Sequence, residues 1–221
     1  MGDRLVFAEF NPEHIIDPKE LVLDRVICGV DFGWHFGALV VAGLQNNVMY
    51  ILETYAYKEK QLSEWIGILQ DVRERYKDIF SNIICDSAEP RSIEQIKNAG
   101  LPAIAVEKTQ DSIKNGIQLI KKRLTNKGLY IFKDAKKSYC NKLDQDKVPT
   151  TLPDEMYSYE YDLDNEKPIA KNNHLCDSLR YVCLTIDKQG NYDFIISGDD
   201  DELPDDEIWQ ALSGTPYRES I

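Results

Sequence analysis

Apolar and polar residues follow two different periods along the chain, and the first part has the period of a sheet. Short apolar runs at 26–30, 38–44 and 48–55 predict three consecutive strands. Their connections contain glycine and the pair Asn46-Asn47, which are typical of tight turns. We therefore expect these three strands to be antiparallel neighbours.

Beyond these strands, helical and strand patterns alternate. Leu62–Tyr76 has helical spacing, Ile83–Asp86 is a short strand pattern, and Pro90 suits the first turn of a helix that ends at Gly100. Further strands are expected at 102–106, 129–132 and 157–161, and further helices at 113–124 and 173–186. Such an alternation predicts an α/β fold with a mixed sheet of five or more strands and helices on both faces.

The 221 residues suit one such domain with some additional sequence. We expect residues 1–25 to be an extended lead-in that packs on the domain, 26–189 to form the domain, and 190–221 to be an acidic, flexible tail. No apolar run approaches the roughly 20 residues of a membrane span. The five cysteines lack metal spacing, and we expect small buried side chains in a reducing compartment.

The net charge of −12 is unevenly distributed. Ten acids and two bases lie between Asp187 and Ile221, whereas eleven bases and four acids lie between Lys108 and Lys147. The second stretch could bind a polyanion such as DNA in spite of the overall charge. The DNA-contacting residues predicted from this basic stretch are Lys114, Lys121, Lys122, Arg123, Lys136 and Lys137.

Three carboxylates carry the candidate chemistry. Asp31 and Asp86 each follow a short apolar strand pattern, and Asp177 lies in the first turns of the last helical pattern. Three acids at one sheet edge would repel one another unless cations lay between them. Oxygen ligands of this kind fit Mg²⁺ or Mn²⁺. The sequence contains no Walker A motif, no zinc spacing and no nucleophile elbow, so metal-dependent phosphodiester chemistry remains.

Each acid taken alone also has a plainer interpretation. Asp31 could close a turn, and Asp86 could cap the following helix. His174, Asp177 and Tyr181 share a helix face that could simply face solvent. Glu89 could reach a metal through water, although an acid at a helix N-terminus is the simpler account.

Five segments, in order, resemble the nuclease domain of phage terminase large subunits, the DNA-packaging motor, which has a ribonuclease H-like fold. The matching segments are Cys28-Gly-Val-Asp31-Phe-Gly, Cys85-Asp86-Ser-Ala-Glu89-Pro-Arg91, the stretch from Val106 to Ile117, Glu155-Met-Tyr157, and Asn173-His174-Leu-Cys-Asp177-Ser-Leu-Arg180-Tyr181. Together they cover about residues 26–186.

The resemblance implies a two-metal endonuclease that cuts double-stranded DNA with little sequence specificity. Asp31, Asp86 and Asp177 would be the catalytic ligands of two divalent cations, Mg²⁺ or Mn²⁺, and Lys108 and His174 would be auxiliary groups. Cys176 and Ser178 stand where the family often has alanine, and the family's ATPase half is missing. The implied partners are DNA, that ATPase domain, the small terminase subunit and the portal, in the cytoplasm of a bacterial host.

Other classes remain open. An actin-like ATPase or sugar kinase also begins with three antiparallel strands, but it needs a second Asp-x-Gly loop and a longer chain. Another ribonuclease H-like enzyme, such as a resolvase or transposase, would differ in junction preference or strand transfer. A non-catalytic module could bind DNA or portal and use the acids for a structural cation. The acidic run 199–207 could occupy the basic stretch as a DNA mimic or dock on the portal.

Overall fold

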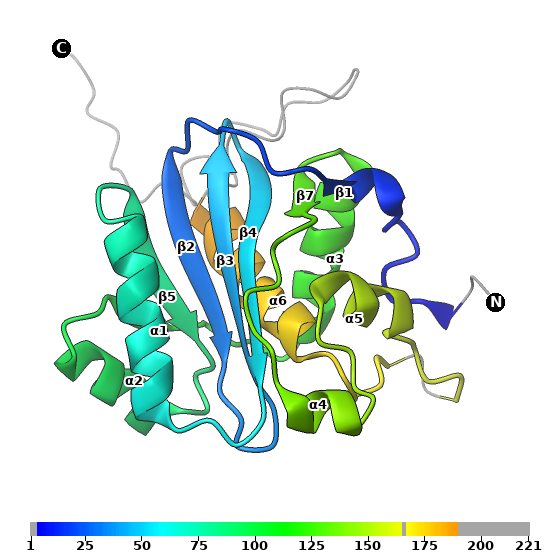
Figure 1. Cartoon of the computed structure of the whole chain (residues 1–221). Coiled ribbons are helices and arrows are strands. Elements are labelled where there is room, and N and C mark those ends of the chain that lie inside the picture. The colour runs from blue at the N-terminus through cyan, green and yellow to red at the C-terminus, as the bar shows by residue number, and fades with distance from the viewer. Residues whose placement is uncertain (1–3, 165–166, 190–221) are drawn as a thin grey trace, which may run out of the picture. The chain divides into compact units, whose positions relative to one another are not determined.

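A seven-stranded mixed sheet with helices on both faces forms the body of the computed structural model, which describes residues 4–164 and 167–189 (Figure 1). The strand order is β1-β7-β4-β3-β2-β5-β6. Its strands are β1 Ile15–Ile16, β2 Arg25–Asp31, β3 Gly37–Gln45, β4 Val48–Tyr57, β5 Phe80–Cys85, β6 Ala103–Ala105 and β7 Leu129–Phe132. The predicted α/β class and mixed sheet are confirmed. The predicted acidic tail, 190–221, lies outside the described residues.

The three antiparallel strands lie inside the sheet, as predicted. Strand β3 pairs antiparallel with both β2 and β4, whereas all other pairings are parallel. Asn46 and Asn47 connect β3 to β4 and both have positive φ, at 50° and 65°. Two such residues form the turn whose twist suits a two-residue hairpin.

Helices cover both faces of the sheet. In Figure 1, α1 lies in front of the sheet, and α3 and α6 lie behind it. Strand β3 is buried at every position but its last, because it has a helical layer on each side. The helices are α1 Leu62–Arg75, α2 Pro90–Asn98, α3 Ser112–Thr125, α4 Asn141–Gln145, α5 Leu152–Ser158 and α6 His174–Gln189, with a 3-10 turn at Pro12–His14. None of the helices in the described ranges is long and apolar enough to cross a bilayer.

Two segments differ from their predictions. The strand predicted at 157–161 is wrong, since helix α5 runs to Ser158 and only isolated bridges follow it. The Thr151 side chain accepts a hydrogen bond from the Asp154 N–H and so caps α5, and a proline lies in the first turn. The lead-in is more than an extended segment: it supplies β1 and buries Val6 and Phe7 in the core. All five cysteines are free, and four of them are buried.

The parallel pairing of β2 and β5 places two of the acids together. Val30 is in register with Cys85, so Asp31 at the end of β2 and Asp86 directly after β5 emerge at the same edge of the sheet. In Figure 1 this edge is at the bottom. Carboxyl ends of parallel strands are where α/β sheets present their sites.

Helix α6 brings the third acid to this edge because it lies unusually close to β2. A Cβ atom on Gly29 would lie 2.0 Å from the Ser178 carbonyl oxygen, so only glycine fits here. Ser178 also ties the helix to the sheet, since its hydroxyl lies 3.2 Å from the carbonyl oxygen of Ala38. Gly29 therefore fixes the depth at which α6 packs on the sheet.

We expect Gly29→Ala to lower the free energy of unfolding by about 1–3 kcal/mol or more, since backbone must move to admit the methyl group. Gly67→Ala in α1 is the matched control. No atom lies within 4 Å of its added Cβ, and we expect it to stabilise the protein by about 0.4–1 kcal/mol. Urea denaturation of both variants measures the difference. Equal effects would show that the close approach at Gly29 can relax freely.

Candidate active site

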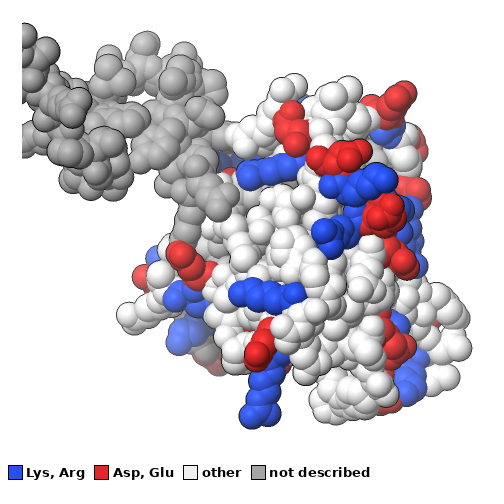
Figure 2. All heavy atoms as spheres, turned by 90° about the vertical axis from the view of Figure 1, so that its left-hand side faces the viewer, with Lys and Arg blue, Asp and Glu red and all other residues white. Residues whose placement is uncertain are grey.

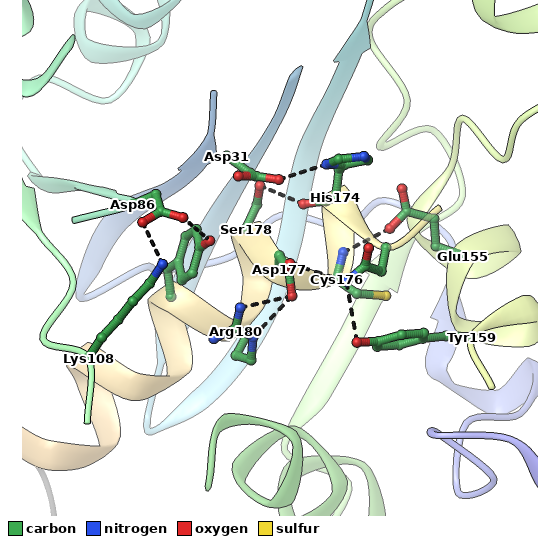
Figure 3. Close-up of polar contacts among 12 residues, drawn as sticks. Asp31, Asp86, Lys108, Glu155, Tyr159, His174, Cys176, Asp177, Ser178 and Arg180 are labelled. Carbon is green, nitrogen blue, oxygen red and sulfur yellow. Dashed lines mark hydrogen bonds and ion pairs between the residues drawn. The ribbon is translucent and has the colours of Figure 1, made fainter. Parts of the chain in front are cut away.

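Three acids from three elements meet at the lower edge of the sheet. Asp31 ends β2, Asp86 follows β5, and Asp177 lies in the first turn of α6. Figure 3 shows them side by side with their polar partners. The sequence prediction named all three, and the structure places them at the same end of the sheet.

Asp31 is held by His174. The His174 Nδ1 atom lies 2.8 Å from Asp31 Oδ2, and the imidazole stacks on Phe36 with ring centroids 4.4 Å apart. The Ser178 hydroxyl donates to the His174 carbonyl oxygen at 2.9 Å. His174 thus fixes the orientation of the Asp31 carboxylate, and Phe36 fixes the plane of the imidazole. The residue predicted as an auxiliary group therefore lies directly beside one of the acids.

Asp86 is surrounded by hydrogen-bond donors. Lys108 Nζ lies 2.5 Å from Asp86 Oδ1, the Ala88 N–H donates to the same oxygen at 2.7 Å, and the Tyr181 hydroxyl donates to Oδ2 at 2.8 Å. Partial burial opposes ionisation, but these donors prevail and lower the pKa of Asp86. Asp86 is therefore an anion at neutral pH, with Lys108 as its counterion.

Asp177 is paired with Arg180, three residues further along α6. Arg180 Nε and Nη2 both donate to Asp177 Oδ1 at 3.0 Å, and Asn173 Nδ2 donates to Oδ2 at 3.1 Å. Burial and the neighbouring negative charge of Asp31 still raise the pKa of Asp177. The Arg180 stem has room because α3 carries glycine at position 116, where a Cβ atom would lie 2.3 Å from Arg180 Cγ.

Tyr181 lies among all three acids. Burial, followed by the charges of Asp31, Asp177 and Asp86, raises the pKa of its hydroxyl far above the ordinary value. Lys108 Nζ lies 5.5 Å from the centre of its ring, and the Arg180 guanidinium carbon lies 4.9 Å from it. The helical period placed Tyr181 on the correct helix face but did not indicate this central position.

Glu155 is a buried acid behind the site, and no local pattern in the sequence assigns it a role. It is fully buried, and its Oε2 accepts a hydrogen bond from the Cys176 N–H at 2.9 Å. Since Cys176 is in the first turn of α6, Glu155 of α5 caps the helix that carries Asp177. Burial raises the pKa of Glu155 to about 8 despite the backbone donors, and the charge of Asp177 contributes to the rise.

Glu89 lies outside the cluster of acids. It is exposed at the N-cap position of α2, and the Ser92 hydroxyl donates to its Oε2 at 3.2 Å. This arrangement matches the simpler interpretation of Glu89 as an acid at a helix N-terminus.

The predicted basic stretch does not form one surface. The prediction that Arg123 contacts DNA is wrong, because its side chain is 3% exposed and Nη2 lies 2.5 Å from Asp187 Oδ1. It joins α3 to α6 inside the protein. Lys137 lines a hollow beside Tyr76, at the end of α1, whereas α3 packs with α6 behind the sheet.

The five lysines predicted to contact DNA differ in their surroundings. Lys121 pairs with Glu9 at 3.5 Å, Lys136 donates to the Thr150 hydroxyl at 2.7 Å, and Lys137 pairs with Asp134 at 3.1 Å. Lys114 and Lys122 are exposed on α3. On the face that Figure 2 presents, basic and acidic side chains are interspersed.

The site has the donor chemistry for a hard cation, but its acids face protein partners. Within the described residues, no three acid, histidine or cysteine side chains converge closely enough to hold a metal ion. Instead, each of the three carboxylates has its own basic neighbour, which is His174, Lys108 or Arg180. All three acids offer carboxylate oxygens, which Mg²⁺ and Mn²⁺ prefer. The chemistry of these oxygen donors therefore suits such ions.

Searches with the sequence find no matching family model and no matching curated protein. Among solved structures, the large terminase of a thermophilic bacteriophage is similar, with a TM-score of 0.67 and 21% identity over 83% of this chain and 45% of that one. The P22 large terminase nuclease domain gives 0.62 and 18%, covering 82% and 92%. The large terminase nuclease of thermophilic phage G20c with bound magnesium gives 0.60 and 14%, covering 82% and 97%.

These comparisons confirm the predicted fold: the chain has the ribonuclease H-like fold of large terminase nuclease domains. The chain spans about half the length of the first of these terminases.

Glu155→Gln should change how stability depends on pH. Between the ordinary pKa of 4.5 and the folded value of about 8, the folded protein keeps a proton that the unfolded chain has released. The free energy of unfolding therefore falls as pH rises through this window, by at most about 1.4 kcal/mol per pH unit. Glutamine keeps the acceptor for the Cys176 N–H but cannot ionise, so this part of the slope should disappear.

Urea denaturation at about pH 5, 6.5 and 8 measures this slope. Glu94→Gln, on an exposed position of α2, is the control and should keep the wild-type slope. A Glu155→Gln variant with the wild-type slope would show that Glu155 is not the group responsible.

Proposed function

We propose that this chain is a metal-dependent endonuclease that hydrolyses phosphodiester bonds of double-stranded DNA during phage genome packaging. The observation that carries the proposal is the meeting of Asp31, Asp86 and Asp177 at one sheet edge, each matched by a basic side chain. The fold shared with terminase nuclease domains supports it.

Asp31, Asp86 and Asp177 would hold two divalent cations, Mg²⁺ or Mn²⁺. Asp31, at the end of β2, would be one of their ligands. Bound ions of this kind supply charge that activates water and stabilises the leaving oxygen. The magnesium-bound G20c structure supports a divalent cation in this fold.

The other side chains of the site have roles that follow from their contacts. His174 orients Asp31, and Tyr181 orients Asp86 through its hydroxyl. Lys108 neutralises Asp86 in this arrangement, and its ammonium would be available to a DNA phosphate once a cation takes that oxygen. Glu155 positions the start of α6 and with it Asp177.

The cutting of DNA would be one part of a larger activity. In the full motor, the partners we propose are an ATPase domain, the small terminase subunit and the portal, in the cytoplasm of the bacterial host. Translocation of DNA would require the ATPase. Phosphate contacts carry no sequence information, so cleavage by this domain should depend little on sequence.

Asp86→Asn tests the catalytic proposal, because asparagine keeps the shape and removes the charge. We expect metal-dependent nicking and linearisation of supercoiled plasmid in the wild type, no cleavage in EDTA, and a rate at least about 100-fold lower in the variant. DNA affinity should change little, since the lost charge acts mainly in the transition state. Asp71→Asn, an exposed acid on α1, is the control and should cut normally.

Other results would select between the alternatives. Preferential cutting of four-way junctions, or joining of strands, would favour a resolvase or transposase activity. A folded wild type that binds DNA but cuts it with neither Mg²⁺ nor Mn²⁺ would favour a binding module.

Lys114→Ala tests the proposed DNA contact of α3. Binding that releases counterions weakens with salt, and the slope of log affinity against log salt falls by about 0.9 for each phosphate that the protein no longer neutralises. We expect Lys114→Ala to reduce this slope by about 1 in a fluorescence anisotropy titration of duplex DNA. Lys77→Ala, 64% exposed and paired with Glu74 at the end of α1, is the control. Identical slopes for the wild type and both variants would remove Lys114 from the DNA-binding surface.

A further inference from the structure

Next to the loop that follows Asp31 lies an open hollow of about 470 Å³ with aromatic side chains in its wall. It is formed by the loop after β2, the start of α1 and the start of α2, and its lining includes Phe32, Trp34, Trp65, Lys60 and Glu89. A volume of this size is within the range of sites for small organic groups. We propose that the hollow binds an unpaired base of the DNA strand next to the phosphate that is cut.

This inference rests on the proposed nuclease function and adds a substrate preference to it. Trp34 is three residues from Asp31, and Glu89 is three residues from Asp86. Three residues span at most about 11 Å, so two walls of the hollow are tied directly to the catalytic acids. A nucleotide that neighbours the scissile phosphate is therefore within reach of the hollow.

Trp34 is exposed although the loop that carries it is well held. Trp34 is 58% exposed, yet its backbone carbonyl accepts a hydrogen bond from the Glu59 N–H at 2.6 Å. At the other end of the loop, Phe36 stacks on His174. Tryptophan is enriched at binding surfaces, because its ring is apolar and its N–H can donate a hydrogen bond.

The turn within the loop is equally constrained. A Cβ atom on Gly33 would lie 2.2 Å from the Phe36 carbonyl oxygen, so this position requires glycine. The position of Trp34 thus follows from the fold of the loop. An indole carried on such a loop offers a flat surface on which any of the four bases can stack.

The charges of the hollow favour a base over a phosphate. One cation, Lys60, and one anion, Glu89, are among its lining residues. Lys60 is already engaged, since Nζ lies 3.2 Å from Glu64 Oε1 and 4.0 Å from the centre of the Tyr57 ring. Glu89 can accept hydrogen bonds from the amino groups of bases, which a phosphate does not offer. The aromatic side chains can stack on the face of a nucleobase, and the polar side chains can bond to its edge.

Bases inside a duplex are stacked on both faces and cannot enter such a hollow. Single-stranded DNA, or a duplex that is locally melted, should therefore bind more tightly through Trp34 than a fully paired duplex does. A free single strand and a melted duplex both offer unpaired bases. The oligonucleotides used in the test distinguish these two sources.

The test measures the affinity of the full chain, in EDTA, for four labelled oligonucleotides by fluorescence anisotropy. The probes are single-stranded oligo(dT), an abasic strand of equal length, a paired duplex, and the same duplex with a short central bubble. We expect Trp34→Ala to weaken binding of oligo(dT) and of the bubble about 5- to 100-fold, the range for loss of one base–aromatic stack. Binding of the abasic strand and the paired duplex should change less than about twofold.

Two further variants separate stacking from folding. Trp34→Phe keeps an aromatic surface and should retain affinity for oligo(dT) within about threefold, while the quenching of tryptophan fluorescence by this strand should decrease. Tyr139→Ala removes an aromatic side chain that is 72% exposed and is not part of the hollow, and it should behave as the wild type. Equal losses on oligo(dT) and the abasic strand, or no loss with Trp34→Ala, would overturn the proposal.

Failure of this inference can be distinguished from failure of the proposed nuclease. Asp86→Asn should keep Trp34-dependent binding of oligo(dT) while it loses cleavage. If the wild type does not cut DNA but the Trp34 effect is present, the base site remains and the nuclease is excluded. If plasmid cleavage is normal and the Trp34 effect is absent, the nuclease remains and the base site is excluded.

Discussion

The close approach of α6 to β2 is the constraint on which the site depends. With Gly29 beneath the Ser178 carbonyl, the helix lies near enough to the sheet for its first turn to reach the strand ends. Any larger residue at Gly29 would move Asp177 and His174 away from Asp31 together, because both are on the same rigid helix. A change in sheet–helix packing is therefore also a change in the spacing of the acids.

Electrostatic balance explains how three acids coexist at this edge. Partly buried carboxylates of like charge are unfavourable unless each is compensated. Here Lys108, in the loop before α3, and Arg180, further along α6, are the cationic partners of Asp86 and Asp177, and the His174 ring nitrogen lies 2.8 Å from Asp31. The compensation is incomplete at Asp177, whose pKa remains raised by burial and by Asp31.

The strands that carry Asp31 and Asp86 could be predicted from the sequence because they have local signals. Apolar runs marked β2 and β5, and the acids followed directly from their ends. The sequence indicated no roles for Tyr181 and Glu155, which acquire them through burial and through contacts with distant segments. Arg123 shows the opposite error, since a lysine-rich helix gives no indication of which basic residue points inward. The residue types in the sequence predicted which chemistry the site could have. Tertiary packing determined which side chains lie in the site.

The loop from Phe32 to Phe36 connects the proposed base site to the acid Asp31. It begins directly after Asp31 and ends with a ring stacked on His174, which in turn holds the same aspartate. One end of the loop is therefore bonded directly to Asp31, and the other end contacts Asp31 through His174. Trp34 lies between these two ends. A base stacked on Trp34 would contact a loop whose two ends are both connected to Asp31. Substrate recognition and orientation of this carboxylate would then depend on one short, constrained piece of backbone.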